Sequence, residues 1–482
     1  MLHFHSETQK QKKMAFPYDV KLVRSFRRDE QVKLGCAGIL GCFFVSVVFL
    51  ALLKPYLISS LPISNLQIPV RSGLTLLRIE DTSTRQQGES QSLVLQSKLV
   101  CNVTDPKTDH CEMTGDVRVH GNSSEVFLVS SPMDAKAGNA SLEIKPYPRK
   151  KDPGAMANVN KLTLKLLKGN EEAAPTCTLN HKVPAVMFSI AGYTGNLFHD
   201  FSDVLVPLFL TTRHFHGEVQ FVITDYKSWW VNRYSAVLKQ LSNYGIIDFD
   251  RDNRTHCFQA AHVGLKFHKE LSIDSTRTPQ GYSMHDFSKF LRSSYSLQRE
   301  TAIKVNDGSN KKPRLLIISR KRSRSFTNEG EIGELARSLG FEVIVAEANL
   351  STDFSKFLHI VNSCDVLMGV HGAGLTNLVF LPTNAVVIQI IPLGRLGSFG
   401  RADFGVPAID MKLRYLEYKI KENESSLIEH YPLNHPVFRN PISIHRRGWT
   451  AIKSVYLDNQ NVKLDVVRFR STLLEALELL RR

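Results

Sequence analysis

The sequence C-D-V-L-M-G-V-H-G-A-G-L-T-N-L-V-F-L-P, from Cys364 to Pro382, decides the fold class of the chain. Its first part, Asp365 to Val370, is a short apolar run, which is typical of a strand buried on both faces of a parallel sheet. His371 to Gly374 forms a turn in which missing side chains allow close approach, and the apolar pattern of Leu375 to Leu381 predicts a helix. A strand, a glycine-rich turn and a helix N-terminus present free N–H groups and a positive dipole end that favour a phosphate group. Because many α/β proteins use such a turn only to pack a helix on a strand, that alternative stays open.

The chain around this stretch alternates between strands and helices. Strands are predicted at residues 313–319, 341–346 and 385–391, and helices at residues 329–339 and 353–362. This pattern indicates a Rossmann-like half that binds its ligand at the carboxyl ends of the strands. The chain has no G-x-x-x-x-G-K-[ST] motif, which disfavours a P-loop nucleotidase, and G-V-H-G-A-G is not the dinucleotide-binding motif.

A second Rossmann-like half is predicted earlier in the chain. Its strands fall at residues 183–191, 218–224 and 257–265, and its helices at residues 196–210 and 230–241. Short strands at residues 116–120 and 125–130 precede it, and a strand at 414–419 and an amphipathic helix at 466–480 end the chain. The sequence therefore predicts an α/β protein in which two Rossmann-like halves face each other across a cleft.

The N-terminal region predicts a membrane anchor. Residues 34–53 are 20 uncharged, mostly apolar residues, which span about 30 Å as a helix and match the hydrocarbon core of a bilayer. This stretch begins too far from the N-terminus, and is too long, for an ordinary cleaved signal peptide. Residues 1–33 carry eight Lys and Arg residues, whereas only Lys54 follows closely after the span. The positive-inside rule therefore places the N-terminus in the cytosol and the rest of the chain in a lumen, beyond a stem at residues 54–98.

The charge of the chain limits its partners. The formal net charge is +15 at pH 7, and most of it lies after the predicted anchor. Nucleic acid is not the expected partner of a lumenal protein, so the surplus indicates anionic ligands such as nucleotide diphosphates or acidic polysaccharides. A generally solvated basic surface is the alternative explanation.

Cysteines and glycosylation sequons agree with a secretory-pathway protein. Two of the seven cysteines lie in the predicted anchor, and five remain for the lumenal part, so at least one is unpaired. The first expected disulfide joins Cys101 to Cys111 and the second joins Cys177 to Cys257, while Cys364 is expected to be a small buried residue. Six N-x-[ST] sequons follow the anchor, at Asn102, Asn122, Asn139, Asn253, Asn349 and Asn423. Neither C-x-x-C nor H-E-x-x-H spacing occurs, so a zinc site is poorly supported.

Basic residues follow the first strand of the C-terminal half. R-K-R-S-R, from Arg320 to Arg324, comes directly after the strand at 313–319, and Asn328 leads into the next helix. Arginine offers a planar fork to phosphate oxygens. Opposite the turn at His371 to Gly374, Arg320 and Arg324 would clamp a diphosphate, although a solvated basic loop remains the alternative.

The N-terminal half supplies candidate acid–base residues. G-N-L-F-H-D-F-S-D, from Gly195 to Asp203, opens a helix with His199, Asp200 and Asp203 on or near its first turns. A sugar acceptor must lose its hydroxyl proton as it attacks, and a histidine such as His199 is the side-chain type whose ordinary titration range suits this role. His199 is therefore the expected general base, with Asp200 as the alternative base. A packing or capping role for His199 also stays open.

Several of these stretches resemble one family. Ser319 to Ile332, Gly369 to Pro382 and Gly195 to Asp203 resemble the three signature stretches of glycosyltransferase family 61. C-E-M-T-G-D-V-R-V-H-G (residues 111–121), E-S-S-L (424–427) and R-R-G-W (446–449) are similar to its plant branch of xylan xylosyl- and arabinosyltransferases. The resemblance covers about residues 99–482, and K-L-V-R-S-F-R-R-D-E-Q (21–31) also resembles the plant branch.

This resemblance implies a GT-B fold, residence in the Golgi membrane as a type II protein, and transfer from a UDP-activated pentose with inversion. The acceptor-side domain would be residues 99–310 and the nucleotide-sugar-binding domain residues 311–482. His199 or Asp200 would face the acceptor, near Asp203. The residues that would hold the nucleotide sugar are Arg320, Arg324, Asn328, His371, Gly372, Ala373, Gly374, Thr376 and Asn377.

The implied donor is UDP-xylose or UDP-arabinofuranose and the implied acceptor is xylan, with no metal required, because arginine and a helix dipole can neutralise departing UDP. Oligomers with itself or with other Golgi transferases are a further possibility. Two alternatives stay open. The chain would transfer another sugar, such as N-acetylglucosamine, to a glycoprotein, or it would be a catalytically silent lumenal protein that binds nucleotide sugars or glycans.

Overall fold

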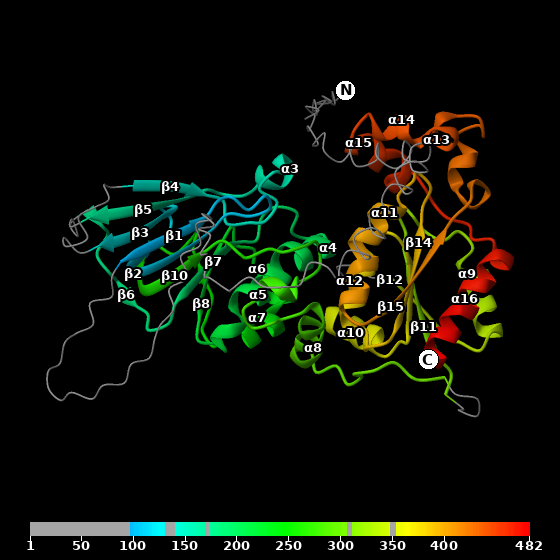
Figure 1. Ribbon diagram of the computed structural model, residues 1–482, viewed down its shortest axis with the longest axis horizontal. Coiled ribbons are helices and arrows are strands. Elements are labelled where there is room, and N and C mark those ends of the chain that lie inside the picture. The colour runs from blue at the N-terminus through cyan, green and yellow to red at the C-terminus, as the bar shows by residue number, and fades with distance from the viewer. Residues whose placement is uncertain (1–96, 131–139, 169–172, 306–310, 348–352) are drawn as a thin grey trace, which may run out of the picture. The chain divides into compact units, whose positions relative to one another are not determined.

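The computed structural model describes residues 97–130, 140–168, 173–305, 311–347 and 353–482 (Figure 1). The predicted tail, the anchor and all but the end of the stem lie outside the described residues, as do the sequons at Asn139 and Asn349. Within the described ranges, no helix combines the length and the apolar character that crossing a bilayer requires. The described residues all belong to one unit of the chain and form a mixed α/β structure, which confirms the predicted class.

The first sheet joins the predicted β-rich entry region to the first Rossmann-like half. Its strand order is β4-β5-β3-β2-β10-β7-β8-β9, with β1 paired to β2 and β6 to β10. Strand β10 pairs antiparallel to β2 and parallel to β7, so it links the antiparallel and parallel parts of the sheet. The strands are β1 (Lys98–Asn102), β2 (His110–His120), β3 (Glu125–Ser130), β4 (Ala140–Ile144), β5 (Leu162–Lys168), β6 (Leu179–Asn180), β7 (Ala185–Ser189), β8 (Gln220–Thr224), β9 (Ile247–Asp248) and β10 (Thr255–Val263).

The helical segments of this part differ from the prediction in two places. The predicted helix at 196–210 is an α-helix interrupted by a π-helix, and the predicted helix at 230–241 breaks at Tyr234 into two. The segments are α3 (Pro153–Met156), α4 (Leu197–His199), π-helix η2 (Asp200–Leu205), α5 (Val206–Thr212), η3 (Arg213–Phe215), α6 (Ser228–Arg233), α7 (Ser235–Leu241), η4 (Ser275–Arg277) and α8 (Met284–Ser294).

The second sheet is parallel throughout, with the order β12-β11-β13-β14-β15. Its strands are β11 (Arg314–Ser319), β12 (Glu342–Glu347), β13 (Val366–Val370), β14 (Val386–Ile391) and β15 (Arg414–Lys419). All five residues of β13 are buried, as the apolar run after Asp365 predicts. One face of the sheet packs on α9 (Glu329–Ser338) and α16 (Val466–Arg481), and the other face belongs to the core that includes α10 (Phe354–Asn362).

The predicted helix after the glycine turn is a 3₁₀ helix, η5 (Ala373–Phe380), rather than an α-helix. It ends before Pro382, which holds Leu381 in an extended conformation. The remaining segments of this part are α11 (Gly397–Gly400), π-helix η6 (Arg401–Gly405), α12 (Val406–Asp410), η7 (Glu422–Glu424), η8 (Ser426–Glu429), α13 (Pro436–Arg439), α14 (Pro441–His445), α15 (Trp449–Ile452) and π-helix η9 (Lys453–Asp458).

A continuous apolar core connects the two sheets. The rings of Phe201 from η2 and Phe380 from η5 lie 5.5 Å apart, and both belong to one buried cluster. Arg292 of α8 donates a hydrogen bond of 3.1 Å to the Leu381 carbonyl. The segment after the glycine turn is therefore packed against η2 and α8, which brings residues from both predicted halves into contact.

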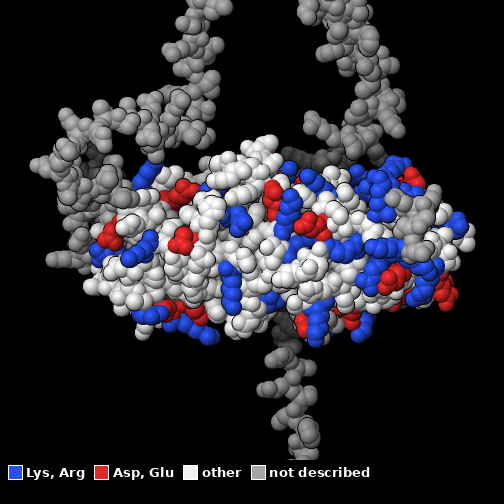
Figure 2. Space-filling view, turned by 90° about the horizontal axis from the view of Figure 1, so that it is seen from below, with Lys and Arg blue, Asp and Glu red and all other residues white. Residues whose placement is uncertain are grey.

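The described residues include two disulfides and many basic surface side chains. The structure contains disulfides between Cys101 and Cys111 and between Cys177 and Cys257, and Cys364 is buried with a free thiol. Lys and Arg side chains are spread over much of the face shown in Figure 2, interspersed with Asp and Glu. Because the basic surface on this face is broad, net charge alone does not locate the binding site.

Candidate functional site

Arg320, Arg324 and Gly372 meet at the carboxyl ends of β11 and β13. Arg320 directly follows β11, and Arg324 adopts a left-handed backbone conformation with φ 56°. The Arg324 Nη1 atom donates a hydrogen bond of 2.9 Å to the carbonyl of His371. A Cβ atom on Gly372 would lie 2.6 Å from Arg324 Nη1 and 3.1 Å from Arg320 Nη1. Both guanidinium groups therefore lie against the glycine turn, and we call Arg320 and Arg324 the arginine pair.

The arginine pair is electrostatically uncompensated. Within the part of the chain that the structure describes, neither guanidinium forms an ion pair with a carboxylate, and Asp458 acts on Arg324 only from a longer distance. Burial lowers the pKa of Arg320, and burial together with the Arg320 charge lowers the pKa of Arg324 to about 10. The buried Nε of Arg324 has no hydrogen-bond partner among the described residues. Two desolvated cations side by side are costly, so this arrangement suits a bound anion.

His371 is held as a neutral hydrogen-bond donor. Tyr415 donates its hydroxyl proton to Gln389 Oε1 at 2.7 Å, and Gln389 Nε2 donates to His371 Nδ1 at 2.7 Å. Because Nδ1 accepts this bond, the ring proton resides on Nε2. Burial, and then the charges of Arg324 and Arg320, lowers the pKa of His371 to about 3. The imidazole therefore stays uncharged at neutral pH and presents an N–H group beside the arginine pair.

The other residues predicted for the nucleotide lie in different environments. Asn328 donates a hydrogen bond of 2.8 Å to the carbonyl of Leu464 and accepts one of 3.0 Å from its N–H, so its amide ties the start of α9 to the chain before α16. Ala373 begins η5, and Gly374 accepts a bond of 2.8 Å from Asn377 Nδ2. Thr376 Oγ1 and Asn377 Oδ1 are buried without a partner in the described structure. The structure therefore brings the arginine pair to the turn but directs Asn328 away from it.

His199 and Asp203 form the centre of the N-terminal part of the site. His199 Nδ1 lies 2.9 Å from Asp203 Oδ2, and Asp203 is completely buried. The Asp203 carboxylate also accepts bonds from the Tyr147 hydroxyl at 2.8 Å and from Arg149 Nε and Nη2 at 2.6 and 2.7 Å. Burial raises the pKa of Asp203, but Arg149 and His199 outweigh that effect and hold it at about 2. Asp203 therefore remains ionised and orients His199 through Nδ1–H, which leaves the Nε2 lone pair available.

Arg149 links this pair to a second carboxylate. Its Nη2 atom lies 2.7 Å from Glu270 Oε2, which also accepts a hydrogen bond of 3.1 Å from Ser202. Arg149 has a left-handed backbone with φ 79° and lies in the stretch K-P-Y-P-R-K-K-D-P-G, which local patterns identify only as a loop. Because Arg149 contacts residues 54 and 121 positions away, no local sequence signal marks it as part of the site.

Asp200 does not have the geometry of an acceptor-facing base. Its side chain is 1% exposed, and Oδ1 accepts bonds from the Gly195 N–H at 2.9 Å and Trp230 Nε1 at 3.0 Å. Oδ2 accepts a bond of 2.9 Å from the Tyr234 hydroxyl. Both oxygens are therefore occupied within the core, and Asp200 anchors the turn before α4 to α6 and α7. We assign Asp200 a positioning role in place of the alternative base predicted from the sequence.

Asp403 and Phe404 bring the two groups of site residues together. Phe404 lies in η6, with its ring centroid 5.6 Å from Phe198 and 5.6 Å from His371. The Asp403 carboxylate lies 4.0 Å from His371 Nε2 and interacts electrostatically with Glu270 and Arg149. Asp403 was not among the predicted site residues, because R-A-D-F-G-V-P (401–407) has neither apolar periodicity nor a recognised motif. Its only local signal is an aspartate shortly after the buried strand β14.

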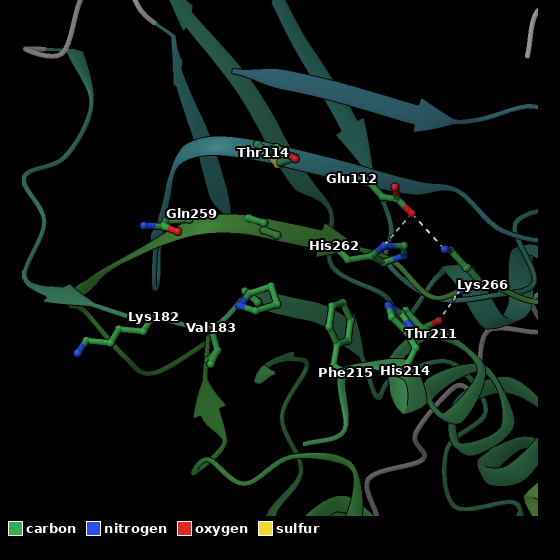
Figure 3. Close-up of a pocket in the computed structure, with 15 residues that line it drawn as sticks. Glu112, Thr114, Lys182, Val183, Thr211, His214, Phe215, Gln259, His262 and Lys266 are labelled. Carbon is green, nitrogen blue, oxygen red and sulfur yellow. Dashed lines mark hydrogen bonds and ion pairs between the residues drawn. The ribbon is translucent and has the colours of Figure 1, made fainter. Parts of the chain in front are cut away.

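A separate cavity of about 380 Å³ lies elsewhere in the first sheet (Figure 3). Its lining includes Val183 and Ala185 at the amino end of β7, whereas His199 follows the carboxyl end of that strand. Glu112 points toward His262 and Lys266 within it, at 3.6 and 3.1 Å. None of the residues lining the cavity belongs to the site described above. In the described ranges, no three His, Cys, Asp or Glu side chains are grouped as metal ligands.

Comparison with known proteins decides the family. Residues 197–388 match the family Glycosyltransferase 61. The chain is 49% identical over 399 residues to an alpha-1,3-arabinosyltransferase of Oryza sativa subsp. japonica, a match that covers 83% of this chain and 68% of the relative. It is 45% identical over 397 residues to a beta-1,2-xylosyltransferase of the same species, covering 80% and 84%. A xylan glycosyltransferase of Arabidopsis thaliana is 38% identical over 413 residues, covering 83% and 81%.

The chain belongs to glycosyltransferase family 61. It is therefore a glycosyltransferase, as the resemblance of its signature stretches implied. The family match begins at α4, just before His199, and includes the arginine pair and His371. It ends in β14, so Asp403 lies beyond it, and Arg149 lies before it. The site of this family 61 glycosyltransferase thus draws residues both from the matched region and from segments outside it.

Proposed function

We propose that this glycosyltransferase transfers a pentose, xylose or arabinofuranose, from a UDP-sugar to xylan with inversion, during cell-wall polysaccharide synthesis. Relatives that are named arabinosyltransferase, xylosyltransferase and xylan glycosyltransferase support the substrate class. The observation that carries the chemistry is the arginine pair, since its half-buried guanidinium groups lie against a glycine turn and lack a carboxylate partner among the described residues. A diphosphate supplies the missing negative charge.

The donor side stabilises the leaving group. Arg320 and Arg324 hold the diphosphate together with free N–H groups of the turn, and His371 donates Nε2–H to the same anion. As the sugar–oxygen bond breaks, its electron pair moves to the β-phosphate oxygen, and these fixed donors stabilise the charge that develops there. The protein's own cations and dipoles supply this neutralisation.

The acceptor side removes the proton. A xylan hydroxyl attacks the anomeric carbon from the face opposite UDP, and its proton passes to the Nε2 atom of His199. Asp203 holds the ring through Nδ1 and stabilises the imidazolium that forms, while Arg149 and Tyr147 keep Asp203 ionised and in place. One glycosidic bond forms, one bond to UDP breaks, and the anomeric configuration inverts.

The cellular setting is part of the proposal. We place the chain in the Golgi membrane as a single-pass type II protein, anchored by residues 34–53, with a GT-B arrangement of residues 99–310 and 311–482. The basic flank of the apolar span and the sequons after it support this topology. Protease treatment of sealed microsomes should spare the chain beyond the anchor, and digestion of that part from outside would refute the topology.

The decisive experiment is a panel of donors and acceptors. UDP release by the solubilised full-length protein is measured with UDP-xylose, UDP-arabinofuranose and UDP-N-acetylglucosamine, each with xylo-oligosaccharides or a glycopeptide. Turnover with a UDP-pentose and xylo-oligosaccharides supports the proposal. Turnover only with the N-acetylglucosamine donor and the glycopeptide would overturn it, and binding without turnover of any pair would indicate a silent binding protein.

The clamp itself is tested by Arg320→Ala. Loss of a charge-assisted phosphate contact should cost about 1.5 to 3 kcal/mol of UDP binding. The matched control is Arg322→Ala, because Arg322 lies in the same loop but is exposed. Equal UDP affinity of both folded variants and the wild type would contradict the assignment.

A further inference from the structure

Asp403 is a half-buried carboxylate that forms no hydrogen bond with the other residues the structure describes. It lies in η6, the π-helix that precedes α12, and its side chain is 15% exposed. The closest charged or polar group that pairs with it is His371 Nε2, at 4.0 Å, which is too long for a hydrogen bond. Buried carboxylates are normally paired or hydrogen-bonded, because desolvation of an unpaired charge is costly. The Asp403 carboxylate is therefore free to accept hydrogen bonds from a ligand.

The surroundings of Asp403 place it between the two sides of the reaction. His371, beside the arginine pair, lies 4.0 Å from Asp403, and the charges of Arg149, which binds Asp203, and of Glu270 also act on Asp403. Burial and then Glu270 raise the pKa of Asp403 to about 7, although Arg149 opposes them. In the proposed reaction, the diphosphate lies beside the arginine pair and the acceptor hydroxyl lies beside His199. The group between them is the transferred sugar.

Aromatic side chains lie close to Asp403 and His371. The ring centroids of Phe399 and Phe404 lie 5.2 and 5.6 Å from that of His371, and Phe404 also contacts Phe198, the neighbour of His199. Aromatic rings suit the C–H faces of a sugar, while a carboxylate accepts hydrogen bonds from its hydroxyls. Phosphate is not a suitable partner for Asp403, because two negative groups repel each other.

We propose that Asp403 binds the pentose of the donor by accepting hydrogen bonds from its ring hydroxyls, and so helps to select an uncharged sugar. This inference rests on the proposed function and deepens it. Glu270 also acts on Asp403, but its own charge is paired with Arg149 at 2.7 Å. A donor with a carboxylate, such as UDP-glucuronic acid, would meet the negative charge of Asp403 and bind poorly, whereas the hydroxyls of a pentose can donate hydrogen bonds to it.

The test compares the affinities of UDP and of UDP-sugars for the solubilised full-length protein by titration calorimetry, without acceptor. In Asp403→Asn, affinity for the preferred UDP-pentose should fall at least tenfold, while affinity for UDP should stay within twofold. Affinity for UDP-glucuronic acid should rise, because one repulsive charge is gone. The matched control is Glu342→Gln, which removes an exposed carboxylate paired with Arg314 on the surface.

Two results of the titrations would overturn the inference, and a turnover assay divides the first of them. In the first, the variant binds the UDP-pentose with the same affinity as the wild type. In the second, the variant loses affinity for the UDP-pentose and for UDP-glucuronic acid equally, which would show a general disturbance of the site. An unchanged UDP-pentose affinity with a turnover at least a hundredfold lower would make Asp403 the general base instead. Retained UDP binding shows that the variant is folded. If the wild-type protein binds UDP and every UDP-pentose with the same affinity, the proposed function fails instead. That result is seen in the wild type, so it is distinguishable from a failure of the Asp403 inference, which is seen only in the variant.

Discussion

Asp403→Asn should make the ligand-free protein more stable at neutral pH. The carboxyl has an ordinary pKa of 3.8, and burial and Glu270 raise it to about 7 in the folded state. Between these two values, the folded protein binds a proton at Asp403 that the unfolded chain has already lost. The free energy of unfolding therefore falls as pH rises from about 4 to about 7, and the whole penalty is present above pH 7. Asparagine has a similar shape and no charge, so the variant does not lose this free energy of unfolding as the pH rises.

The size of the effect follows from the pKa difference. Each pKa unit corresponds to about 1.4 kcal/mol, so the ionised carboxylate costs up to about 4 kcal/mol of folding free energy at pH 7.5. For a folded region of this length, such a gain raises the melting temperature by about 5 °C. Differential scanning fluorimetry of wild type and variant, at pH 7.5 and at pH 4, measures the difference directly. The variant should melt higher at pH 7.5, and the two proteins should melt together at pH 4.

Other titrating groups cancel in this comparison, because they are common to both proteins. Glu342→Gln provides the control for removal of one negative charge at the surface, and its melting temperature should follow that of the wild type at both pH values. If Asp403→Asn destabilises the protein at pH 7.5, or if its difference from the wild type is the same at both pH values, the carboxyl is not an unpaired charge in the folded state. The reasoning that assigns it a ligand would then fail.

Three further predictions test the site and the fold. His199→Ala should keep UDP affinity but lower turnover on the order of a hundredfold or more, and His430→Ala, at an exposed histidine, should change neither. Gly372→Ala should weaken UDP binding in the same calorimetric assay, since the new Cβ would lie 2.6 Å from Arg324 Nη1 and the backbone there has φ 145°. Paired replacement of Cys177 and Cys257 by serine opens a loop with a sequence separation of 80 residues. It should cost about 4 kcal/mol of stability, measured by denaturant unfolding.

Local patterns predicted much of the second sheet. The strand before His371 and the strand before Arg320 both appear as continuous apolar runs, because a parallel strand that is covered on both faces has only buried side chains. The glycine turn was equally visible, since φ 145° at Gly372 requires a residue without a side chain. These features depend on residues adjacent in the chain. Arg320 was expected opposite the turn because both follow the carboxyl ends of strands in one sheet, and the direct pairing of β11 with β13 brings them together.

The acceptor side was less predictable, because its geometry depends on distant residues. His199 and Asp203 are four positions apart and could be paired from the sequence, but Arg149, which neutralises Asp203, comes from a loop 54 positions earlier. Asp200 has the same local context as Asp203, yet Trp230 and Tyr234 enclose it in the core. Which of two neighbouring aspartates faces the site is therefore decided by packing partners that no local pattern contains.

The two π-helices of the site share a cause that can be read from the sequence once the structure is known. Val206 and Val406 each donate to a carbonyl five residues earlier, and a proline follows each of them. Pro207 and Pro407 lack the N–H that an α-helix would give to the carbonyls of Asp203 and Asp403, so neither segment can close into regular α-helix there. The wider turn presents Asp203 to His199 in one segment and Asp403 to His371 in the other. In both halves, a proline four residues after the aspartate thus converts an ordinary helix start into a turn that directs a carboxylate toward a histidine of the site.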